Sequence, residues 1–247
     1  MLTENQIERN LKKLNIKENF IIIHSDITGL YFKNFSLNKL WKIIFKTLGK
    51  DKTYIFPAFT LYSTKKKFWS YNKSKSDSGI LSEYFRKKIS SVRTAHPLHS
   101  VCIFGKSKDE IPKNKSLSSF GKGSVWEWLC RSKDVCNLSF GLNLLGGATF
   151  CHYSEEFMNV NYRKYITINF LIQNKLNKKI KKKYLYFARK KRYKNNWNKC
   201  EKELIKKLFI KKIIFPENKY QILKMNTFEV TNFLIKKLRK NKHYLIK

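Results

Sequence analysis

Acidic residues are scarce in this chain of 247 residues. Only 17 Asp and Glu stand against 53 Lys and Arg, which gives a formal net charge of +36. A site for a polycationic ligand needs several carboxylates, and this chain has few to offer, so an anionic partner suits the charge better. Arginine is scarce as well, with 8 residues against 45 lysines. Arginine donates two parallel hydrogen bonds to phosphate or guanine, which lysine does not. The scarcity of arginine therefore argues against interpreting the charge as a nucleic-acid surface. We attribute most of the lysine excess to an AT-rich coding bias.

Long apolar runs and paired cysteines are also missing. The longest apolar stretches, 20–23 and 208–215, are far shorter than the about 20 residues of a membrane-spanning helix. Residues 1–18 lack the apolar centre of a signal peptide. The five cysteines include no CxxC pair, so neither a zinc site nor a disulfide framework is indicated. We therefore expect a cytoplasmic protein with reduced thiols, no membrane span and no metal.

The apolar spacing in the first two thirds of the chain predicts an α/β fold. Strands are predicted at 20–23, 53–59, 101–104 and 135–140, and helices at 3–15, 37–48, 82–88 and 124–131. The first strand, the helix after it and the second strand form a βαβ unit, which predicts a parallel pair. Residues 63–78 are polar and aromatic, and are interpreted as a long loop that covers a site.

The last third of the chain is more basic than the rest. Residues 163–247 hold 27 Lys and Arg but only 4 Asp and Glu. Apolar alternation predicts strands at 165–172 and 183–187, and helical spacing predicts helices at 201–210 and 227–238. No internal repeat or Gly/Ser linker interrupts the chain. We therefore expect one domain over 1–247, a mixed sheet flanked by helices, with the Lys-rich part 163–247 folded onto it.

One short segment carries candidate chemistry. His152 stands three residues before Glu155, directly after the Gly146-Gly147 pair. If this stretch is helical, the two side chains share a face, and Glu155 accepts a hydrogen bond from one ring nitrogen. The other nitrogen is then left as a base that takes a proton from an amine or hydroxyl. The alternative is an incidental His/Glu pair on a solvated helix. Cys151 is adjacent to His152 in sequence, so the two point to different sides of a helix and do not form a Cys/His nucleophile.

Four further motifs precede this segment in a fixed order. They are His24–Asp26 at a strand end, Tyr54–Thr60, the loop Arg93–Val101 with the sequence RTAHPLHSV, and Phe120–Ser124. Together with His152–Glu155 they resemble the aminoglycoside 3-N-acetyltransferase family, over about residues 22–156. The Arg93 loop is the most specific match, whereas His96 and His99 within it are interpreted as structural members of the loop.

This resemblance implies an antibiotic N-acetyltransferase-like α/β fold, distinct from the GNAT fold. It also implies acetyl transfer from acetyl-CoA, as co-substrate, to a primary amine of an aminoglycoside or amino sugar. By the same resemblance, His152 is the general base and Glu155 orients it. The resemblance further implies that residues from two motifs lie on the CoA side: His24, Ser25, Arg93, Thr94, Ser100 and Val101.

The sequence departs from the family in one respect that bears on the site. The Asp that some members place before the histidine is missing, since Ala148 and Thr149 occupy that stretch. Either the dyad works alone, or Asp26 serves from another loop.

The acceptor is left open by the sequence. The net charge favours an anionic amine, such as a nucleotide-linked amino sugar, whereas an aminoglycoside needs acids gathered at the site. The acids that could gather there are Asp26, Glu83, Glu127, Glu155 and Glu156. Two alternative functions remain: a protein that binds single-stranded nucleic acid through Lys181–Lys194, and a catalytically weakened relative. A nucleic acid is not the expected partner, and the sequence does not indicate an oligomeric state.

Overall fold

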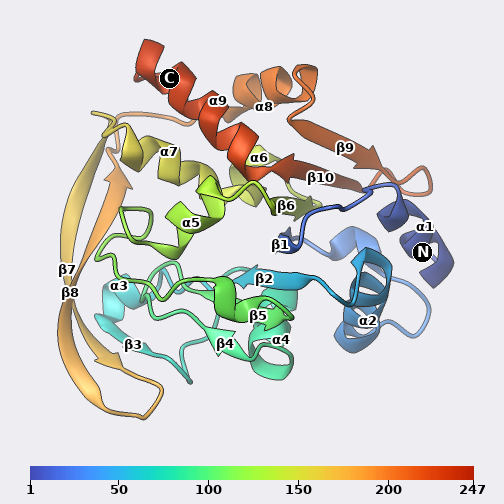
Figure 1. Cartoon of the computed structure of the whole chain (residues 1–247), viewed down its shortest axis with the longest axis horizontal. Helices are drawn as coiled ribbons and strands as arrows, with labels where there is room; N and C mark the ends of the chain where they lie inside the picture. The colour runs from blue at the N-terminus through green and yellow to red at the C-terminus, as the bar shows by residue number, and fades with distance from the viewer.

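The computed structural model describes residues 1–247, and a seven-stranded mixed sheet runs through its middle (Figure 1). The strand order is β4-β5-β2-β1-β6-β10-β9. The strands are β1 (Phe20–Ser25), β2 (Thr53–Pro57), β4 (Val92–Arg93), β5 (Val101–Gly105), β6 (Val135–Phe140), β9 (Ile210–Ile214) and β10 (Gln221–Asn226). β1 pairs in parallel with β2 and β6, and the outer pairs are antiparallel. The predicted parallel pair and the mixed α/β sheet are therefore confirmed.

The apolar run of β1 explains why this strand is central. Ile22 packs into the hydrophobic cluster on one face of the sheet, whereas Ile21 and Ile23 pack into the cluster on the other. All three are completely buried. A strand that is apolar on both faces needs helices above and below it, and the fold supplies both layers.

Helices cover the two faces of this sheet. One face is covered by α1 (Glu4–Lys12), α2 (Leu37–Leu48) and α4 (Ile80–Lys88), and the other by α5 (Val125–Arg131), α7 (His152–Phe157), α8 (Trp197–Lys206) and α9 (Thr227–Lys240). The short α3 (Ser63–Lys66), α6 (Leu144–Gly147) and 3₁₀ turns η1 (Thr28–Leu30), η2 (Lys108–Glu110) and η3 (Thr149–Cys151) lie in connections. α9 is the longest helix, with 14 residues, and no helix is long and apolar enough to cross a bilayer.

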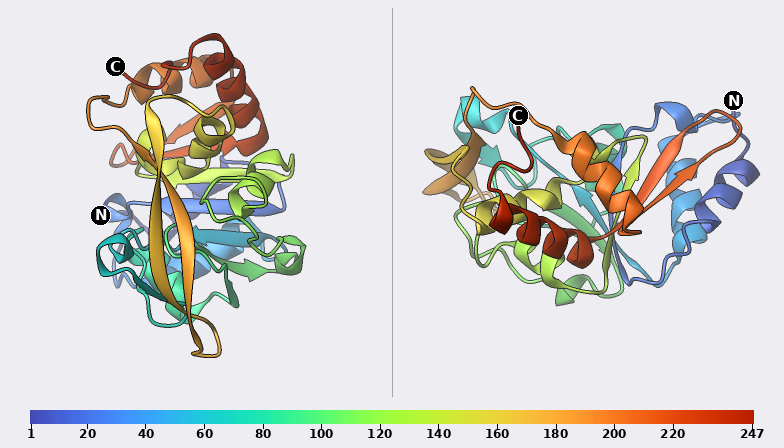
Figure 2. Two further views of the ribbon diagram at one scale, coloured as in Figure 1. Left: turned by 90° about the vertical axis from the view of Figure 1, so that its left-hand side faces the viewer. Right: turned by 90° about the horizontal axis from the view of Figure 1, so that it is seen from above.

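A long antiparallel hairpin forms most of a second, three-stranded sheet. It consists of β7 (Arg163–Gln173) and β8 (Lys179–Arg189), and β3 (Phe68–Ser70) pairs with β7. Figure 2 shows the hairpin running along one side of the molecule, across the ends of the central strands. The hairpin therefore forms a wall beside the strand ends where the predicted site residues gather.

Two predicted elements differ from the structure, and further strands were not predicted. The predicted loop 63–78 contains α3 and β3. The helix predicted at 201–210 begins at Trp197 and ends at Lys206, and Ile210 begins β9 instead. β9 and β10 were not predicted, and for β9, the outermost strand, the reason is that two lysines break the apolar alternation. Lysine on an edge strand is a common means of preventing contact with another sheet.

Candidate active site

The ring of His152 is held by a buried carboxylate. His152 is the first residue of α7, and its Nδ1 is hydrogen-bonded to Oε2 of Glu155, one helical turn later. The Glu155 side chain is 1% exposed, whereas that of His152 is 26% exposed. Because an ionised carboxylate only accepts hydrogen bonds, we assign the ring proton to Nδ1. Nε2 is then unprotonated, and it has no partner within the chain.

Two further residues fix Glu155 from the start of β7. Arg163 Nη2 lies 2.8 Å from Oε2, and the Tyr162 hydroxyl donates to Oε1 at 2.7 Å. Burial alone raises the pKa of Glu155, but His152 and Arg163 outweigh it and lower the pKa to about 2. The carboxylate is therefore ionised. Asp26, the third partner considered from the sequence, instead accepts hydrogen bonds from the backbone and hydroxyl of Thr28.

The surroundings of His152 favour its neutral form. Burial lowers the pKa of His152 below its ordinary value, the charge of Arg163 lowers it further, and Glu155 opposes both. The ring lies between Phe120 and Trp197, each with its ring centroid 5.6 Å from that of His152. A neutral, oriented imidazole with a free nitrogen is equipped to accept a proton.

His152 faces a small cavity of about 180 Å³, here called the His152 pocket. It is lined by Phe59, Leu61, His99, Ser119, Phe120, Thr149, His152, Arg163, Tyr186 and Phe187. Tyr186 and Phe187 come from the hairpin, so β8 forms one wall. None of the lining residues is acidic.

His24 reaches the His152 pocket only through another residue. Its Nδ1 lies 3.0 Å from Oδ1 of Asn137, and its Nε2 lies 3.1 Å from the hydroxyl of Thr149, which lines the pocket. The amide nitrogen of Asn137 donates to the carbonyl of Gly147, so its oxygen is the atom available to His24. Nδ1–H therefore donates to Asn137, and Thr149 donates to Nε2. Direct contact between His24 and CoA stays a prediction.

The polar groups of the loop Arg93–Val101 are hydrogen-bonded within the chain. The Arg93 guanidinium donates to Ser100 and to the carbonyls of Ala58, Tyr71 and Ser74. Thr94 accepts a hydrogen bond from the amide of Val101, and Ser100 donates to Ala58. The four residues of this loop that were assigned to the CoA side are all buried: Arg93, Thr94, Ser100 and Val101. Their contact with CoA stays a prediction, and the observed bonds give them a role in shaping the loop.

Ser25 differs from the other residues assigned to the CoA side. Its buried hydroxyl has no hydrogen-bond partner. It lies at the end of β1, where its carbonyl approaches Gly79 at the start of α4. Ser25 therefore keeps hydrogen-bonding capacity that a ligand could use.

The two loop histidines have different surroundings. His96 accepts hydrogen bonds from the amides of Leu98 and His99, in keeping with its interpretation as a structural residue. His99, interpreted in the same way, also lines the His152 pocket, and its Nδ1 lies 2.6 Å from the Ser119 hydroxyl. Cys151 is buried, and burial raises the pKa of its thiol well above the ordinary value, so no thiolate nucleophile forms.

Several residues of this site lie outside the motifs of the sequence. Ser119, Arg163 and Trp197 belong to no quoted motif, and they reach His152 or its pocket from three separate parts of the chain. Only the tertiary fold brings them together. The sequence offered a weak signal for Arg163 alone, since arginine is rare in this chain and this one precedes an apolar strand.

A histidine whose neutral form is favoured, with a buried carboxylate on one side and a pocket on the other, has the groups that proton transfer needs. The sequence matches the family model described as aminoglycoside 3-N-acetyltransferase over residues 22–238. The chain therefore belongs to the aminoglycoside 3-N-acetyltransferase family, and the resemblance predicted from the motifs is confirmed. The match also covers most of the Lys-rich part, where no motif was recognised. The chain is accordingly an acyltransferase, with acetyl-CoA as its co-substrate.

Several solved structures share the fold of this chain. The YokD protein from Bacillus subtilis shares 17% identity with a TM-score of 0.76, covering 97% of this chain and 100% of that one. AAC-VIa bound to sisomicin shares 13% identity with a TM-score of 0.82, covering 97% and 98%. AAC-IIIb, solved as a binary complex with CoASH, shares 14% identity with a TM-score of 0.80, covering 97% of both chains. No curated protein matches the sequence.

Proposed function

We propose that this chain transfers an acetyl group from acetyl-CoA to a primary amine of an aminoglycoside or amino sugar, with His152 as general base. One observation carries the proposal. Nδ1 of His152 is hydrogen-bonded to the buried carboxylate of Glu155, whereas Nε2 has no hydrogen-bond partner, and the His152 side chain lines a pocket. A base of this kind is what an amine needs in order to lose a proton during attack on a thioester.

The reaction balances without a covalent enzyme intermediate. The neutral amine nitrogen attacks the thioester carbonyl carbon, and its proton passes to His152 Nε2. The carbon–sulfur bond then breaks, and the imidazolium returns the proton to the departing sulfur. The products are an amide and free CoA thiol. Glu155 stabilises the imidazolium in between, because its low pKa keeps it ionised throughout.

Thr149 supports the placement of the amine. Its hydroxyl proton is directed to His24, so its oxygen lone pairs remain for a donor in the His152 pocket. A primary amine has N–H groups to offer to this oxygen. His24 therefore acts as a positioning residue, through the hydroxyl that it orients.

The size of the His152 pocket limits what it contains. Its volume of about 180 Å³ is below the roughly 300–1,000 Å³ of typical ligand pockets. We infer that the thioester and the amine meet inside it, while the nucleotide end of CoA and the rest of the acceptor lie outside.

The charges at the site support one acceptor class over the other. AAC-VIa was solved with sisomicin, a ligand that we carry over to this chain only as a candidate. The His152 pocket holds the cation Arg163 and no free acid. None of the five candidate acids, Asp26, Glu83, Glu127, Glu155 and Glu156, lines the pocket, and Glu155 behind it is paired with His152 and Arg163. This distribution favours an amino sugar that carries negative charge, such as a nucleotide-linked one, over a polycationic drug.

Release of CoA thiol tests the proposal. The purified protein is assayed with acetyl-CoA against sisomicin and a panel of nucleotide-linked amino sugars. We expect amine-dependent release that falls about 10²–10⁴-fold in His152→Ala. Equal rates for the variant and the wild type would remove His152 as the base. Efficient acetylation of sisomicin with no turnover of any nucleotide-linked sugar would remove the anionic acceptor.

A further inference from the structure

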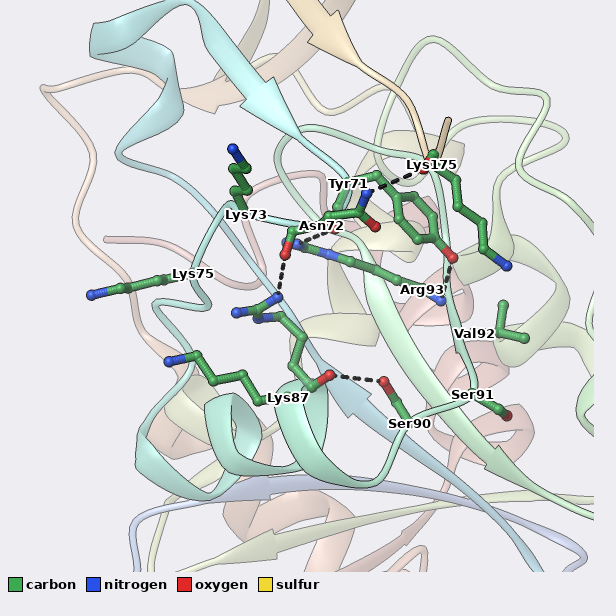
Figure 3. Close-up of a pocket in the computed structure, with 11 residues that line it drawn as sticks. Tyr71, Asn72, Lys73, Lys75, Lys87, Ser90, Ser91, Val92, Arg93 and Lys175 are labelled. Carbon is green, nitrogen blue, oxygen red and sulfur yellow. Dashed lines mark hydrogen bonds between the residues drawn. The ribbon is translucent and has the colours of Figure 1, made fainter. Parts of the chain in front are cut away.

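The motif loop RTAHPLHSV lines two cavities. Arg93, at its start, lines a basic cavity of about 500 Å³, whereas His99, near its end, lines the His152 pocket. Figure 3 shows the first of these cavities, where the Arg93 amide donates to the Tyr71 hydroxyl at 2.9 Å. Thr94 and Val101 are joined by hydrogen bonds in both directions, which closes the loop. The ring of His99 is therefore carried by a loop that is fixed at both ends.

The His99 ring has one bonded nitrogen and one free nitrogen. Nδ1 lies 2.6 Å from the hydroxyl of Ser119, and both side chains belong to buried residues, at 8% and 4% exposed. Nε2 has no hydrogen-bond partner within the chain, and unlike Nε2 of His96 it is not sealed from solvent. Because His99 lines the His152 pocket, Nε2 opens into that pocket. A buried polar atom without a partner keeps hydrogen-bonding capacity for a ligand.

Ser119 determines which nitrogen of His99 carries the proton. The Ser119 hydroxyl has Nδ1 as its only hydrogen-bond partner, so it donates its proton to that nitrogen. Burial holds the pKa of His99 well below its ordinary value, so the ring is neutral and carries a single proton. That proton is therefore on Nε2. His99 presents an N–H donor to the pocket, whereas His152 presents an unprotonated nitrogen.

The donor and the acceptor share apolar surroundings. The ring centroid of Phe120 lies 5.0 Å from that of His99 and 5.6 Å from that of His152. Phe59 packs against His99 from another direction, with its ring centroid at 4.8 Å. A hydrogen bond to a developing charge is stronger among apolar groups than in water.

We propose that His99 donates a hydrogen bond from Nε2 to the thioester carbonyl oxygen of acetyl-CoA and stabilises the negative charge that develops there. This role rests on the proposed function, which supplies the amine and the base. As the amine nitrogen bonds to the carbonyl carbon, an electron pair of the carbonyl group moves to its oxygen. The pair returns when the carbon–sulfur bond breaks, and the Nε2 proton stays on His99 throughout. A neutral imidazole suits this role, because it donates a hydrogen bond without giving up its proton.

The proposal gives each polar group of the pocket a different atom of the reaction. His152 takes the proton of the amine, Thr149 accepts a hydrogen bond from the amine, and His99 binds the carbonyl oxygen. All three side chains line the same small pocket. It also explains why a loop anchored at Arg93 matters to the reaction, since a donor stabilises a developing charge best when it is already in place.

Infrared spectroscopy tests this hydrogen bond without turnover. Acetyl-CoA labelled with ¹³C at its carbonyl is bound to the protein in the absence of any amine. A hydrogen-bond donor weakens the carbonyl double bond, so we expect its stretch to lie at lower frequency in the wild-type complex than in free acetyl-CoA. An unshifted stretch would overturn the proposal.

Two variants of His99 assign the shift to one nitrogen. The amide nitrogen of glutamine can take the place of Nε2, whereas the shorter asparagine reaches only the place of Nδ1 beside Ser119. We expect His99→Asn to return the stretch towards that of free acetyl-CoA, and His99→Gln to keep most of the shift. A shift that persists in His99→Asn would overturn the proposal. Loss of the shift in both variants would mean that His99 only shapes the pocket.

Kinetics of the same variants measure the stabilisation in the transition state. We expect kcat to fall by about 10²–10³-fold in His99→Asn, the usual loss on removing one such donor. KM for acetyl-CoA should change little, because the charge on the oxygen develops only in the transition state. His99→Gln should keep kcat within about tenfold of the wild type. Equal kcat in His99→Asn and the wild type would contradict the role.

A measurement on the wild type decides the matter if neither variant folds. ¹⁵N NMR of histidine-labelled protein reports which nitrogen of His99 is protonated. A proton on Nε2 supports donation to the pocket, and a proton on Nδ1 overturns it.

Failure of this inference is distinguishable from failure of the proposed function. The infrared measurement needs neither an amine nor the base His152. A shifted carbonyl stretch without thiol release would therefore remove the proposed function alone, whereas thiol release with an unshifted stretch would remove the role of His99 alone.

Discussion

Glu155 combines nearly complete burial with a full negative charge, and three neighbours maintain that combination. His152, Tyr162 and Arg163 all direct hydrogen-bonding groups at its two oxygens. A buried carboxylate with this many partners is fixed in position, and its orientation sets which nitrogen of His152 is free. The chemistry of the site therefore depends on this residue as much as on the histidine.

Replacing the charge of Glu155 tests this role. In Glu155→Gln, the neutral amide no longer stabilises the imidazolium that forms during proton transfer. We expect kcat to fall by about a hundredfold or more, measured as CoA thiol release. Glu156→Gln serves as a matched control, because Glu156 is a buried neighbour without an ion pair. An unchanged kcat in Glu155→Gln, or an equal loss in both variants, would contradict the role.

Arg163 is expected to set the pH at which His152 becomes a base. Arg163 lowers the pKa of His152, so its removal in Arg163→Gln raises that pKa. Because only neutral His152 accepts a proton, the rise of kcat/KM with pH moves to higher pH in this variant.

The pH profile of Arg163→Gln separates this role from a structural one. The charged and titratable groups that face His152 are Glu155 on α7, Arg163 on β7 and His99 in the loop before β5. The pKa of His99 lies well below its ordinary value because of burial, so His99 is neutral over the range of the experiment. If kcat/KM instead falls equally at every pH, and its rise with pH does not shift, then Arg163 only supports the fold.

The sequence predicted the part of the site that is local in the chain. The spacing of His152 and Glu155 indicated their hydrogen bond, because residues three apart share a helix face. Arg163 could not be assigned, because its contact depends on the turn after α7 and on the direction in which β7 leaves it. The His24–Thr149 contact likewise joins β1 to η3, two elements separated by more than a hundred residues.

The two glycines of the Gly146–Gly147 pair, on the short helix α6, differ in the space around them. A Cβ at Gly147 would lie 2.1 Å from the Ser139 hydroxyl, whereas a Cβ at Gly146 would meet nothing nearer than 3.5 Å. Gly147 also supplies the carbonyl that Asn137 and Ser139 bind. The close approach of α6 to β6 therefore requires glycine at one of the two positions only.

Alanine substitutions at the two glycines test this difference. We expect Gly147→Ala to destabilise the fold by about 1–3 kcal/mol in urea unfolding, because α6 must move away from β6. Gly146→Ala is the control, and it should be neutral or stabilise by up to about 1 kcal/mol, since alanine is the better helix former. Equal stability of the two variants would show that α6 moves away from β6 without cost.

Burial explains which elements the sequence predicted well. β1 and β6 are buried on both faces, and α2 has a continuous apolar stripe, so their patterns are clear. β9 reads Ile-Lys-Lys-Ile-Ile, with both lysines exposed at the edge of the sheet. The apolar pattern of β9 matches neither the strand period nor the helix period. Only its pairing with β10 defines it as a strand.

For the whole molecule, the Lys-rich part is continuous with the central sheet. β10 lies between β6 and β9, so the strand that carries Asn137 depends on a C-terminal neighbour. Near the end of the chain, Leu245 is completely buried and Ile246 is 7% exposed, and both pack in the same hydrophobic cluster as Phe20 of β1. We propose that residues 1–247 unfold as one unit despite the difference in charge between the two parts.

Leu245→Ala tests this cooperativity from the far end of the chain. Removing a fully buried leucine side chain from a core costs about 2–5 kcal/mol. If the chain is one unit, this cost lowers the midpoint of a single urea transition, and far-UV circular dichroism and tryptophan fluorescence report the same shift. Lys247→Ala is the control, since its side chain is exposed and its backbone bonds to Lys194 are retained. Two transitions, with only one of them moved by Leu245→Ala, would instead mean that the C-terminal part folds separately and that its contact with the sheet does not couple the two.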